Sequence, residues 1–513
     1  MARLFVVGDP VIPMTPGQAP IARGAVVVEG DRITAVGARA DLERTGPFEA
    51  TLGSEGHVVL PGLVNGHHHA GRTFRSGLPD LPFERRNLLL HLLVAAGTEE
   101  SLYRSTLYSC AELLSGGVTA AAVIFYPNTD LPRLGAEAAL QAYLDSGMRV
   151  AFAVAQRDRA LYVHEDNDGF LGRVPSELAR KVRESAIGRY AARSIGNDQY
   201  FRHVRDLFRR WHGREDRVRI DVGPDWFPSC TDDLLRQSRR AASELGTQIQ
   251  MHLLETRYEM LMARRWFGRS AVEHLAEIGF LGADVVCPHS VWLTGDDVDL
   301  YRAAGVVAVH NPASNLRLFS GIAPLREMLA RGVIVAFGCD GLAFADDNDL
   351  LSDLRLADQL QRTPGILSER ISSRALLAMA TLAGARAVGM SGQIGELAAG
   401  RRADLVLLRK ERMARPYVNP GIPIEDLLLW RARGDDVDTV LVGGRVVVEG
   451  GRTTLIDQAT LARRLAEDAA PAFAASPGPG HDALAQELEP YAVRVLADWD
   501  SLEPPGGYRY NMR

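Results

Sequence analysis

Eight short apolar runs, most of them followed by a stretch of helical periodicity, occupy the middle of this chain and constrain its fold most strongly. They lie at residues 58–64, 118–125, 149–155, 218–222, 248–252, 285–287, 306–309 and 333–337. Strands that alternate with helices form βαβ units around a parallel sheet. Eight such units predict a (β/α)8 TIM barrel, a fold whose chemistry lies at the carboxyl ends of the strands.

Both flanks of the barrel region show a different pattern of short strands bounded by turn residues. These runs lie at 4–7, 24–29, 33–36, 404–408, 439–442 and 445–449, and Gly443-Gly444 separates the last two as in a hairpin. We therefore expect a small β-sandwich built from both chain ends. The predicted domains are the N-terminal part of the sandwich at 1–59, the barrel at 60–385, the C-terminal part of the sandwich at 386–453, and a helical C-terminal extension at 454–513.

Two connections are longer than a barrel requires. Residues 70–97 and 157–217 exceed the usual length of βα loops. Each is either a lid or pocket wall, or a set of extra helices on the barrel exterior.

Composition excludes several classes of partner. The 513 residues carry 58 Lys and Arg against 64 Asp and Glu, so no basic surplus is present to bind nucleic acid. The four cysteines show no CxxC spacing, which favours a reducing compartment. Neither a run of 18 apolar residues nor a leader pattern occurs. We expect a cytoplasmic protein that acts on a small molecule, with no membrane partner.

Histidines follow the first predicted strand. Alternate side chains of a strand share a face, so His67 and His69 point into the barrel mouth together, whereas His68 points away. Two imidazoles on one face can chelate a divalent cation. Alone, this pattern is more often formed by core or surface histidines than by a metal site.

Other polar residues follow later predicted strands. His252 and Glu255 follow the fifth strand, His289 the sixth and Asp340 the eighth. Each alone has an ordinary structural explanation, such as a turn or a helix cap. Together with the first-strand histidines, they would converge on one small volume at the barrel mouth. Three imidazoles and one carboxylate suit zinc or ferrous iron better than calcium or magnesium.

These motifs resemble the amidohydrolase superfamily, and specifically its cytosine deaminase and chlorohydrolase-like branch, which includes triazine hydrolases. The similar segments are PGLVNGHHH at 61–69, HLLET at 252–256, CPHSVWLT at 287–294, HNPASNLRLFSGIAP at 310–324, GCDG at 338–341, GELAAGRRADLVLL at 395–408 and VLVGGRVVVEGGR at 440–452. The resemblance covers residues 1–453. It implies a metal-bearing barrel joined to a β-sandwich made from both chain ends, and a homodimer.

The resemblance also implies the roles of individual residues. The implied metal ligands are His67, His69, His252 and Asp340, and the implied catalytic groups are Glu255, His289 and again Asp340. Some relatives bridge two metals with a carbamylated lysine at the end of the fourth strand. Lys181 and Lys410 are the chain's two lysines, and neither follows a predicted strand of the barrel. We expect one divalent ion, with zinc first and iron or manganese as alternatives.

The function that follows is hydrolytic deamination of an amino-substituted nitrogen heterocycle, such as a pyrimidine, purine, pterin or triazine. Metal-activated water would attack the ring carbon, Glu255 would carry protons, His289 would steady the intermediate, and Asp340 would accept a proton. Removal of a halide or alkylamine, or hydrolysis of a cyclic amide or urea, fits the same site. A catalytically dead scaffold is disfavoured because no ligand is missing. The chain also lacks the paired cysteines of thiolate zinc deaminases and the GxSxG motif of serine hydrolases.

Substrate contacts are less well defined by the sequence. The candidates are Gln156, Trp226, Phe74 and Arg72, which follow strands or lie in the first long loop. Aromatic and amide groups there would suit a flat heterocycle, although ordinary packing beneath the loops explains them equally well. We expect His310 to shape the barrel mouth and His274, in a helical segment, to be structural.

Overall fold

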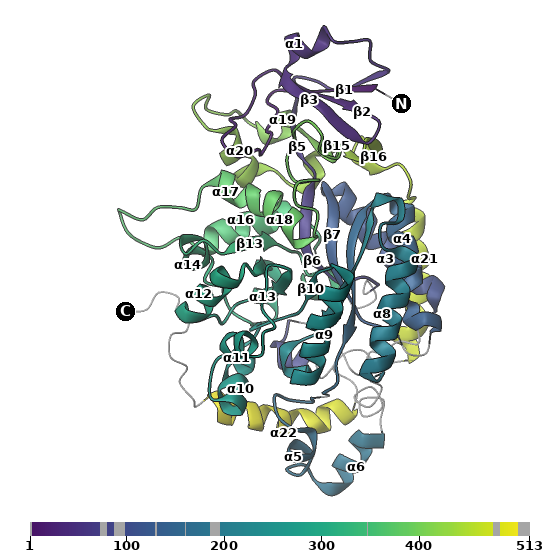
Figure 1. The fold of residues 1–513 in the computed structure, drawn as a ribbon, viewed down its shortest axis with the longest axis vertical. Coiled ribbons are helices and arrows are strands. Elements are labelled where there is room, and N and C mark those ends of the chain that lie inside the picture. Colours follow the sequence, from purple (N-terminus) through teal and green to yellow (C-terminus); the bar gives the residue numbers. More distant parts are fainter. Residues whose placement is uncertain are drawn as a thin grey trace.

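A barrel lies between a β-sandwich at one end and a small group of helices at the other (Figure 1). The computed structural model describes residues 3–71, 80–86, 98–128, 131–159, 161–184, 195–345, 347–475 and 483–500. The strands of the barrel are β6 (Leu63–His68), β7 (Val118–Phe125), β8 (Arg149–Gln156), β9 (Val218–Pro224), β10 (Ile249–Gln250), β11 (Val285–Pro288), β12 (Val307–His310) and β13 (Ile334–Phe337). They are parallel and pair in chain order, and a bridge from His68 to Asp340 joins the last strand to the first. The predicted (β/α)8 barrel is confirmed.

Helices surround this sheet, as the alternating sequence pattern predicts. Those around the barrel are α3 (Glu99–Ser115), α4 (Ala136–Ser146), α8 (Asn197–Trp211), α9 (Asp232–Leu245), α10 (Arg257–Phe267), α11 (Ala271–Glu277), α12 (Gly295–Ala304), α13 (Pro312–Arg317), α14 (Leu325–Ala330), α15 (Leu342–Ala345), α16 (Leu350–Leu360), α17 (Ser373–Met379) and α18 (Leu382–Ala387). Many begin with a side-chain cap. Thr98, Thr231 and Ser372, for example, each accept a hydrogen bond from a backbone N–H of the first turn.

The sandwich consists of two sheets. One contains β1 (Arg3–Gly8), β2 (Gly24–Glu29), β3 (Arg32–Ala38) and β4 (Ala50–Gly53), and the other contains β5 (His57–Pro61), β14 (Leu405–Arg409), β15 (Val437–Val442), β16 (Arg445–Glu449) and β17 (Arg452–Thr453). Val6 and Val28 from the first sheet pack against Val59, Leu405 and Leu441 from the second. Both chain ends therefore build this core, as expected. The domain limits at 59, 385 and 453 stay a prediction.

The first predicted barrel strand was placed wrongly. The run at 58–64 is divided at Gly62: β5 before it pairs with β14 in the sandwich, and β6 after it begins the barrel. The chain passes so close to β7 at Gly62 that an added Cβ would collide with the side chain of Thr119. Both segments are buried and apolar, so hydrophobicity alone does not reveal the change of sheet.

The barrel interior is closed at the sandwich end. Ala385 and Val388, in and just after α18, lie in one buried cluster with Val64, Ala120 and Ala151 of the barrel strands. This packing leaves the opposite, carboxyl end of the strands as the place where polar side chains can gather.

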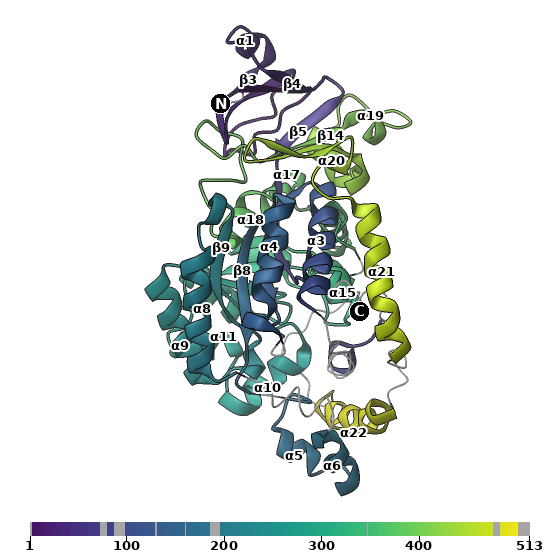
Figure 2. The ribbon, with the colours of Figure 1, turned by 90° about the vertical axis from the view of Figure 1, so that its right-hand side faces the viewer.

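Three helices lie at that opposite end: α5 (Asn167–Leu171), α6 (Ser176–Glu184) and α22 (Ala483–Asp500) (Figure 2). In the segment at 157–217, α8 covers the outside of the barrel, which was one of the two alternatives. Helices α5 and α6 stand at the mouth, and their role as a lid or pocket wall stays a prediction. The remaining helices are α1 (Arg39–Glu43), α19 (Lys410–Met413), α20 (Ile424–Arg431) and α21 (Gln458–Ala475). Among the described residues, no helix is long and apolar enough to cross a membrane.

Candidate active site

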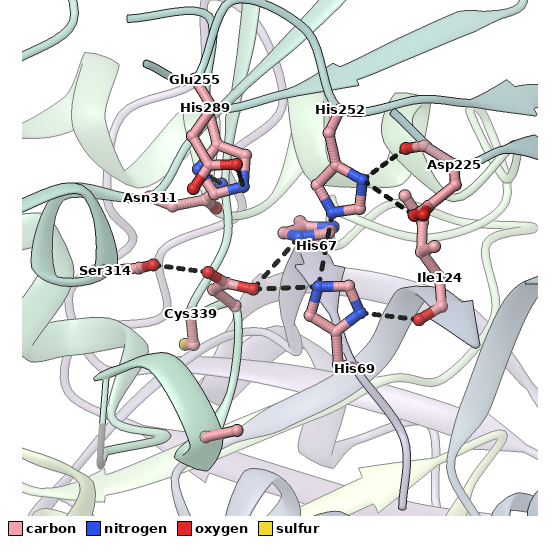
Figure 3. A network of polar contacts seen from close by, with 12 residues as sticks. His67, His69, Ile124, Asp225, His252, Glu255, His289, Asn311, Ser314 and Cys339 are labelled. Atoms are coloured by element: carbon pink, nitrogen blue, oxygen red, sulfur yellow. Dashed lines mark hydrogen bonds and ion pairs between the residues drawn. The ribbon is translucent and has the colours of Figure 1, made fainter. Parts of the chain in front are cut away.

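Four side chains predicted as metal ligands meet at the mouth of the barrel (Figure 3). Asp340 Oδ1 lies 3.3 Å from His67 Nε2 and 3.2 Å from His69 Nε2. The Nε2 atoms of His69 and His252 are 3.4 Å apart. The structure therefore brings together residues from the first, fifth and eighth strands of the barrel.

The hydrogen bonds behind two of these histidines fix their protonation. His69 Nδ1 lies 2.7 Å from the carbonyl oxygen of Ile124, and His252 Nδ1 lies 2.5 Å from that of Asp225. A carbonyl oxygen only accepts, so each Nδ1 carries the proton and donates it. The two Nε2 atoms of the neutral rings then present lone pairs to each other and to the Asp340 carboxylate. Lone pairs at this spacing repel one another unless a cation lies between them.

The burial of these side chains also indicates a site for a cation. His67 and Asp340 are almost fully buried, and neither ring nitrogen of His67 nor Oδ1 of Asp340 forms a hydrogen bond within the described residues. Burial lowers the pKa of His67, and it lowers the pKa of His252 to about 4, so both rings are neutral at pH 7. Neutral imidazole and carboxylate are the forms that bind a divalent metal. The donor set therefore fits such an ion.

Glu255 and His289 lie beside this cluster. Glu255 Oε2 is 3.7 Å from His289 Nε2, and both side chains are buried. Burial first, and then the nearby charge of Asp340, raises the pKa of Glu255 well above its ordinary value. Ring nitrogens of His67, His252 and His289 also lie within 4.8 Å of one another, so the geometry permits His289 as an additional metal donor.

Several supporting groups were not identified from the sequence. Ser314 Oγ donates to Asp340 Oδ2 at 2.5 Å, and Asn315 Oδ1 lies 2.8 Å from His289 Nδ1. Both belong to the segment 310–324 that carries the family resemblance, so their location was indicated although their contacts were not. Glu259 accepts a hydrogen bond from the backbone N–H of Glu255 at 2.8 Å.

Asp225 is the other supporting residue that the sequence did not reveal. It directly follows β9, and its carboxylate Oδ2 accepts from Arg157 at 2.6 Å while its carbonyl orients His252. Such contacts hold a ligand's ring in place. No side-chain motif marks a backbone carbonyl that does this.

The backbone is strained where the site is built. Leu254, His289 and Asp340 have φ values of 51°, 72° and 60°, in the left-handed region that favours glycine. Each such residue costs on the order of 1–3 kcal/mol and persists only where its surroundings enforce it. Three of the strand ends that supply the site carry this strain.

The predicted substrate contacts have different outcomes. Gln156 ends β8, but its Nε2 donates to the carbonyl of Ile195 at 2.7 Å, so this donor is used within the protein. Trp226 lies beside the site, and its Nε1 donates to Glu259 Oε2 at 3.3 Å. Phe74 and Arg72 lie outside the described residues. Their roles stay predictions.

Three other histidines and both lysines lie outside the group of potential ligands. His274 Nε2 contacts Asp232 Oδ1 at 2.8 Å on the outer helices. His68 and His310 are buried next to the site, and neither belongs to a group of potential ligands in the described chain. Lys181 pairs with Glu487 at 3.9 Å and Lys410 with Asp9 at 3.1 Å, both away from the cluster.

Histidine and carboxylate donors at the strand ends of a (β/α)8 barrel are typical of metal-dependent hydrolases. The chain belongs to the amidohydrolase family, whose sequence profile matches residues 58–447. The predicted superfamily, and a hydrolase that acts on carbon–nitrogen bonds, are thereby confirmed by the family and its relatives.

Two named relatives match over most of their length. The chain is 30% identical to the 5'-deoxyadenosine deaminase of Methanosarcina mazei, over 89% of this chain and 95% of the relative. It is 32% identical to the 5-methylthioadenosine/S-adenosylhomocysteine deaminase of Symbiobacterium thermophilum, over 88% of this chain and 94% of the relative.

Solved structures share the fold. An adenosine deaminase from Xanthomonas campestris with bound zinc superposes with a TM-score of 0.77 at 23% identity, covering 92% of this chain and 99% of that one. The atrazine chlorohydrolase of Arthrobacter aurescens gives a TM-score of 0.75 at 24% identity, covering 91% and 99%. At these identities, the likeness concerns the fold alone.

Proposed function

We propose that the protein is a hydrolytic deaminase of an amino-substituted nitrogen heterocycle, with adenosine-type purines as its first class of substrate. The observation that carries this proposal is the meeting of the His67, His69, His252 and Asp340 donors beside the buried Glu255–His289 pair. The relatives that deaminate adenosine derivatives support purines over the other heterocycles.

His67, His69, His252 and Asp340 would hold one divalent ion, and we propose zinc, with iron or manganese as alternatives. Imidazole nitrogens with one carboxylate are a typical zinc donor set. When bound, such an ion lowers the pKa of water to about 7 and so supplies a nucleophile at neutral pH.

Glu255 would act as the proton carrier. Its carboxyl group, which a cation bound beside it would keep ionised, would take a proton from the attacking water and deliver it to the ring nitrogen next to the reacting carbon. His289, which lies 3.7 Å from Glu255, stabilises the oxygen that has added to that carbon. Asp340 accepts the second water proton and passes it to the departing amino group. The amine and water become a carbonyl and ammonia, so atoms and charge balance.

The test is ammonia release with metal analysis. The panel contains 5'-deoxyadenosine, 5-methylthioadenosine, S-adenosylhomocysteine, cytosine, an aminated pterin and an aminotriazine, together with a chlorotriazine and a cyclic urea. We expect one metal ion per chain and ammonia from the adenosine derivatives. Chloride release or ring opening without ammonia would instead select the other reactions that suit this site.

We also propose a cytoplasmic homodimer. The four cysteines, all free and buried, support a reducing compartment. The dimer rests on the family resemblance. Light scattering should give twice the chain mass of 55.9 kDa, and a mass of one chain would contradict it.

A further inference from the structure

The last described helix, α22, is fastened to the insertion that stands at the barrel mouth. Its side chains share one buried apolar cluster with α5, α6 and the segment before them, which includes Leu488, Ala492, Val495, Val163, Phe170 and Leu178. Ion pairs add to this packing: Glu489 binds Arg85 at 2.6 Å, and Glu487 lies 3.9 Å from Lys181. The C-terminal helix and the insertion thus form one cap at the mouth (Figure 2).

Trp499, near the end of α22, packs with the barrel and its outer helix α10 and not with this cap. It is 3% exposed and belongs to the barrel's main hydrophobic core, not to the cap cluster. The guanidinium of Arg265 on α10 lies 5.4 Å from its ring centre. The helix therefore contacts the barrel directly, just beyond the segment that carries Glu255.

A series of contacts leads from Trp499 to the catalytic carboxylate. Its ring centre lies 6.5 Å from that of His164, which meets Trp226 edge-on at 5.1 Å. Trp226 Nε1 donates to Glu259, which also accepts from the backbone N–H of Glu255. Trp499 is thus two rings away from the residues that position Glu255.

His164 depends on these rings for its position. It is 2% exposed, and neither ring nitrogen forms a hydrogen bond within the described residues. Burial lowers its pKa to about 3, so at neutral pH it is uncharged and forms no ion pair with Glu84, 3.9 Å away. Packing against Trp226, Tyr258 and Trp499 is what holds the ring. Removing one of these rings would let it move.

We propose that α22 supports the active site from behind: Trp499 acts as a positioning residue that holds His164 against Trp226, a predicted substrate contact, and so determines which substituents are accepted away from the reacting carbon. This inference rests on the proposed function for its substrate, an adenosine derivative. The C-terminal extension then sets substrate specificity at a site whose reacting groups all come from the barrel.

The kinetic experiment compares Trp499→Ala, Trp499→Phe and the control Trp430→Ala, which removes a tryptophan that is 40% exposed on α20 near the sandwich. For S-adenosylhomocysteine, Trp499→Ala should lower kcat/KM by roughly 10-fold, the lower end for a lost apolar contact in a pocket, mainly through KM. The loss for 5'-deoxyadenosine, which has no bulky substituent, should be smaller. Trp499→Phe should recover most of the loss, and metal content should not change.

Hydrogen exchange supplies a readout that does not need activity. Trp499→Ala should speed exchange in peptides covering 161–171, whereas Trp430→Ala should not. Unchanged exchange there, or an equal kinetic loss for both substrates, would overturn the proposal. If the wild-type protein releases ammonia from no compound, the proposed function fails, and exchange still decides whether Trp499 holds the segment around His164.

Discussion

The two ends of the barrel both bury charged groups, but a buried ion pair at the sandwich end has a partner for every charged atom, whereas the groups at the mouth do not. At the sandwich end, Arg149 binds Asp404 through two contacts, Nε to Oδ2 at 2.7 Å and Nη2 to Oδ1 at 2.8 Å. Asp404 Oδ1 also accepts from Gly443 N, and Arg149 Nη1 donates to the carbonyl of Asp216. Every charged atom of this pair is used.

At the mouth, buried polar atoms are left over. His67, Asp340 Oδ1, Asp225 Oδ1 and His164 are buried and make no hydrogen bond there within the described chain. Buried polar groups are normally satisfied because leaving them unpaired costs about 1–3 kcal/mol each. The comparison teaches that the Arg149–Asp404 pair holds two parts of the chain together, whereas His67 and Asp340 at the mouth keep atoms that a ligand can still bind.

Removing the proposed metal ion from the barrel mouth should have the largest effect on activity. Chelation, or Asp340→Asn, should lower activity by more than about 10⁴-fold because water is no longer activated. Chelation should also lower Tm, since an ion at 100 times its Kd contributes about 2.7 kcal/mol. Activity assays and calorimetry measure both. Zinc should restore the chelated protein, and full activity in its metal-free form would refute the site.

Glu255→Gln should separate catalysis from metal binding at the barrel mouth. A lost proton carrier typically costs about 10²- to 10⁴-fold in rate. We expect that loss in kcat, with metal content close to that of the wild type. The control is Glu411→Gln, whose carboxylate is 82% exposed. Wild-type turnover in Glu255→Gln would show that another group carries the proton.

Arg149→Ala tests whether the ion pair with Asp404 at the sandwich end stabilises the fold. Leaving Asp404 buried without its cation should cost about 3–5 kcal/mol of unfolding free energy. Metal content and activity per folded molecule should stay unchanged, because the pair lies at the opposite end of the barrel. Urea unfolding measures the loss. Replacing both partners, with Arg149→Met and Asp404→Leu, should recover part of it, and a stability equal to wild type in the single variant would contradict the assignment.

The smallest effect concerns Asp353, a buried carboxyl group with fewer hydrogen-bond partners than Asp404. It is buried on α16 and accepts from Ala313 N at 3.1 Å, and burial raises its pKa from 3.8 to about 7. The folded chain therefore keeps a proton between pH 4 and 7 that the unfolded chain loses, so stability falls as pH rises through this range. The slope is at most about 1.4 kcal/mol per pH unit.

Asp353→Asn should flatten this part of the stability curve. Urea midpoints at several pH values between 4 and 7 measure it. The control is Asp168→Asn, since that carboxylate is 88% exposed. Identical pH dependence in Asp353→Asn and the wild type would show that Asp353 does not titrate as described.

The sequence predicts the barrel and the cluster well, because both depend on short-range patterns. Apolar runs mark the strands, and His67, His252 and Asp340 follow them directly, so their convergence comes from the fold itself. The split at Gly62 escaped prediction because two buried strands in different sheets look like one apolar run.

Other features need tertiary contacts. The carbonyls of Ile124 and Asp225 that orient His69 and His252 belong to the backbone, which every residue has. The packing of Trp499 near His164 joins residues 335 positions apart, and no local pattern announces it. The sequence indicated a helical tail but not its place at the mouth.

The pairing of β5 with β14 has a consequence for how the protein is made. Leu60 lies opposite Val406, so this strand pair cannot form until 346 further residues have been synthesised. At about 5–20 residues per second, that takes roughly 20–70 s. Throughout this interval the nascent chain carries β5 without its partner, directly ahead of the segment that bears His67 and His69.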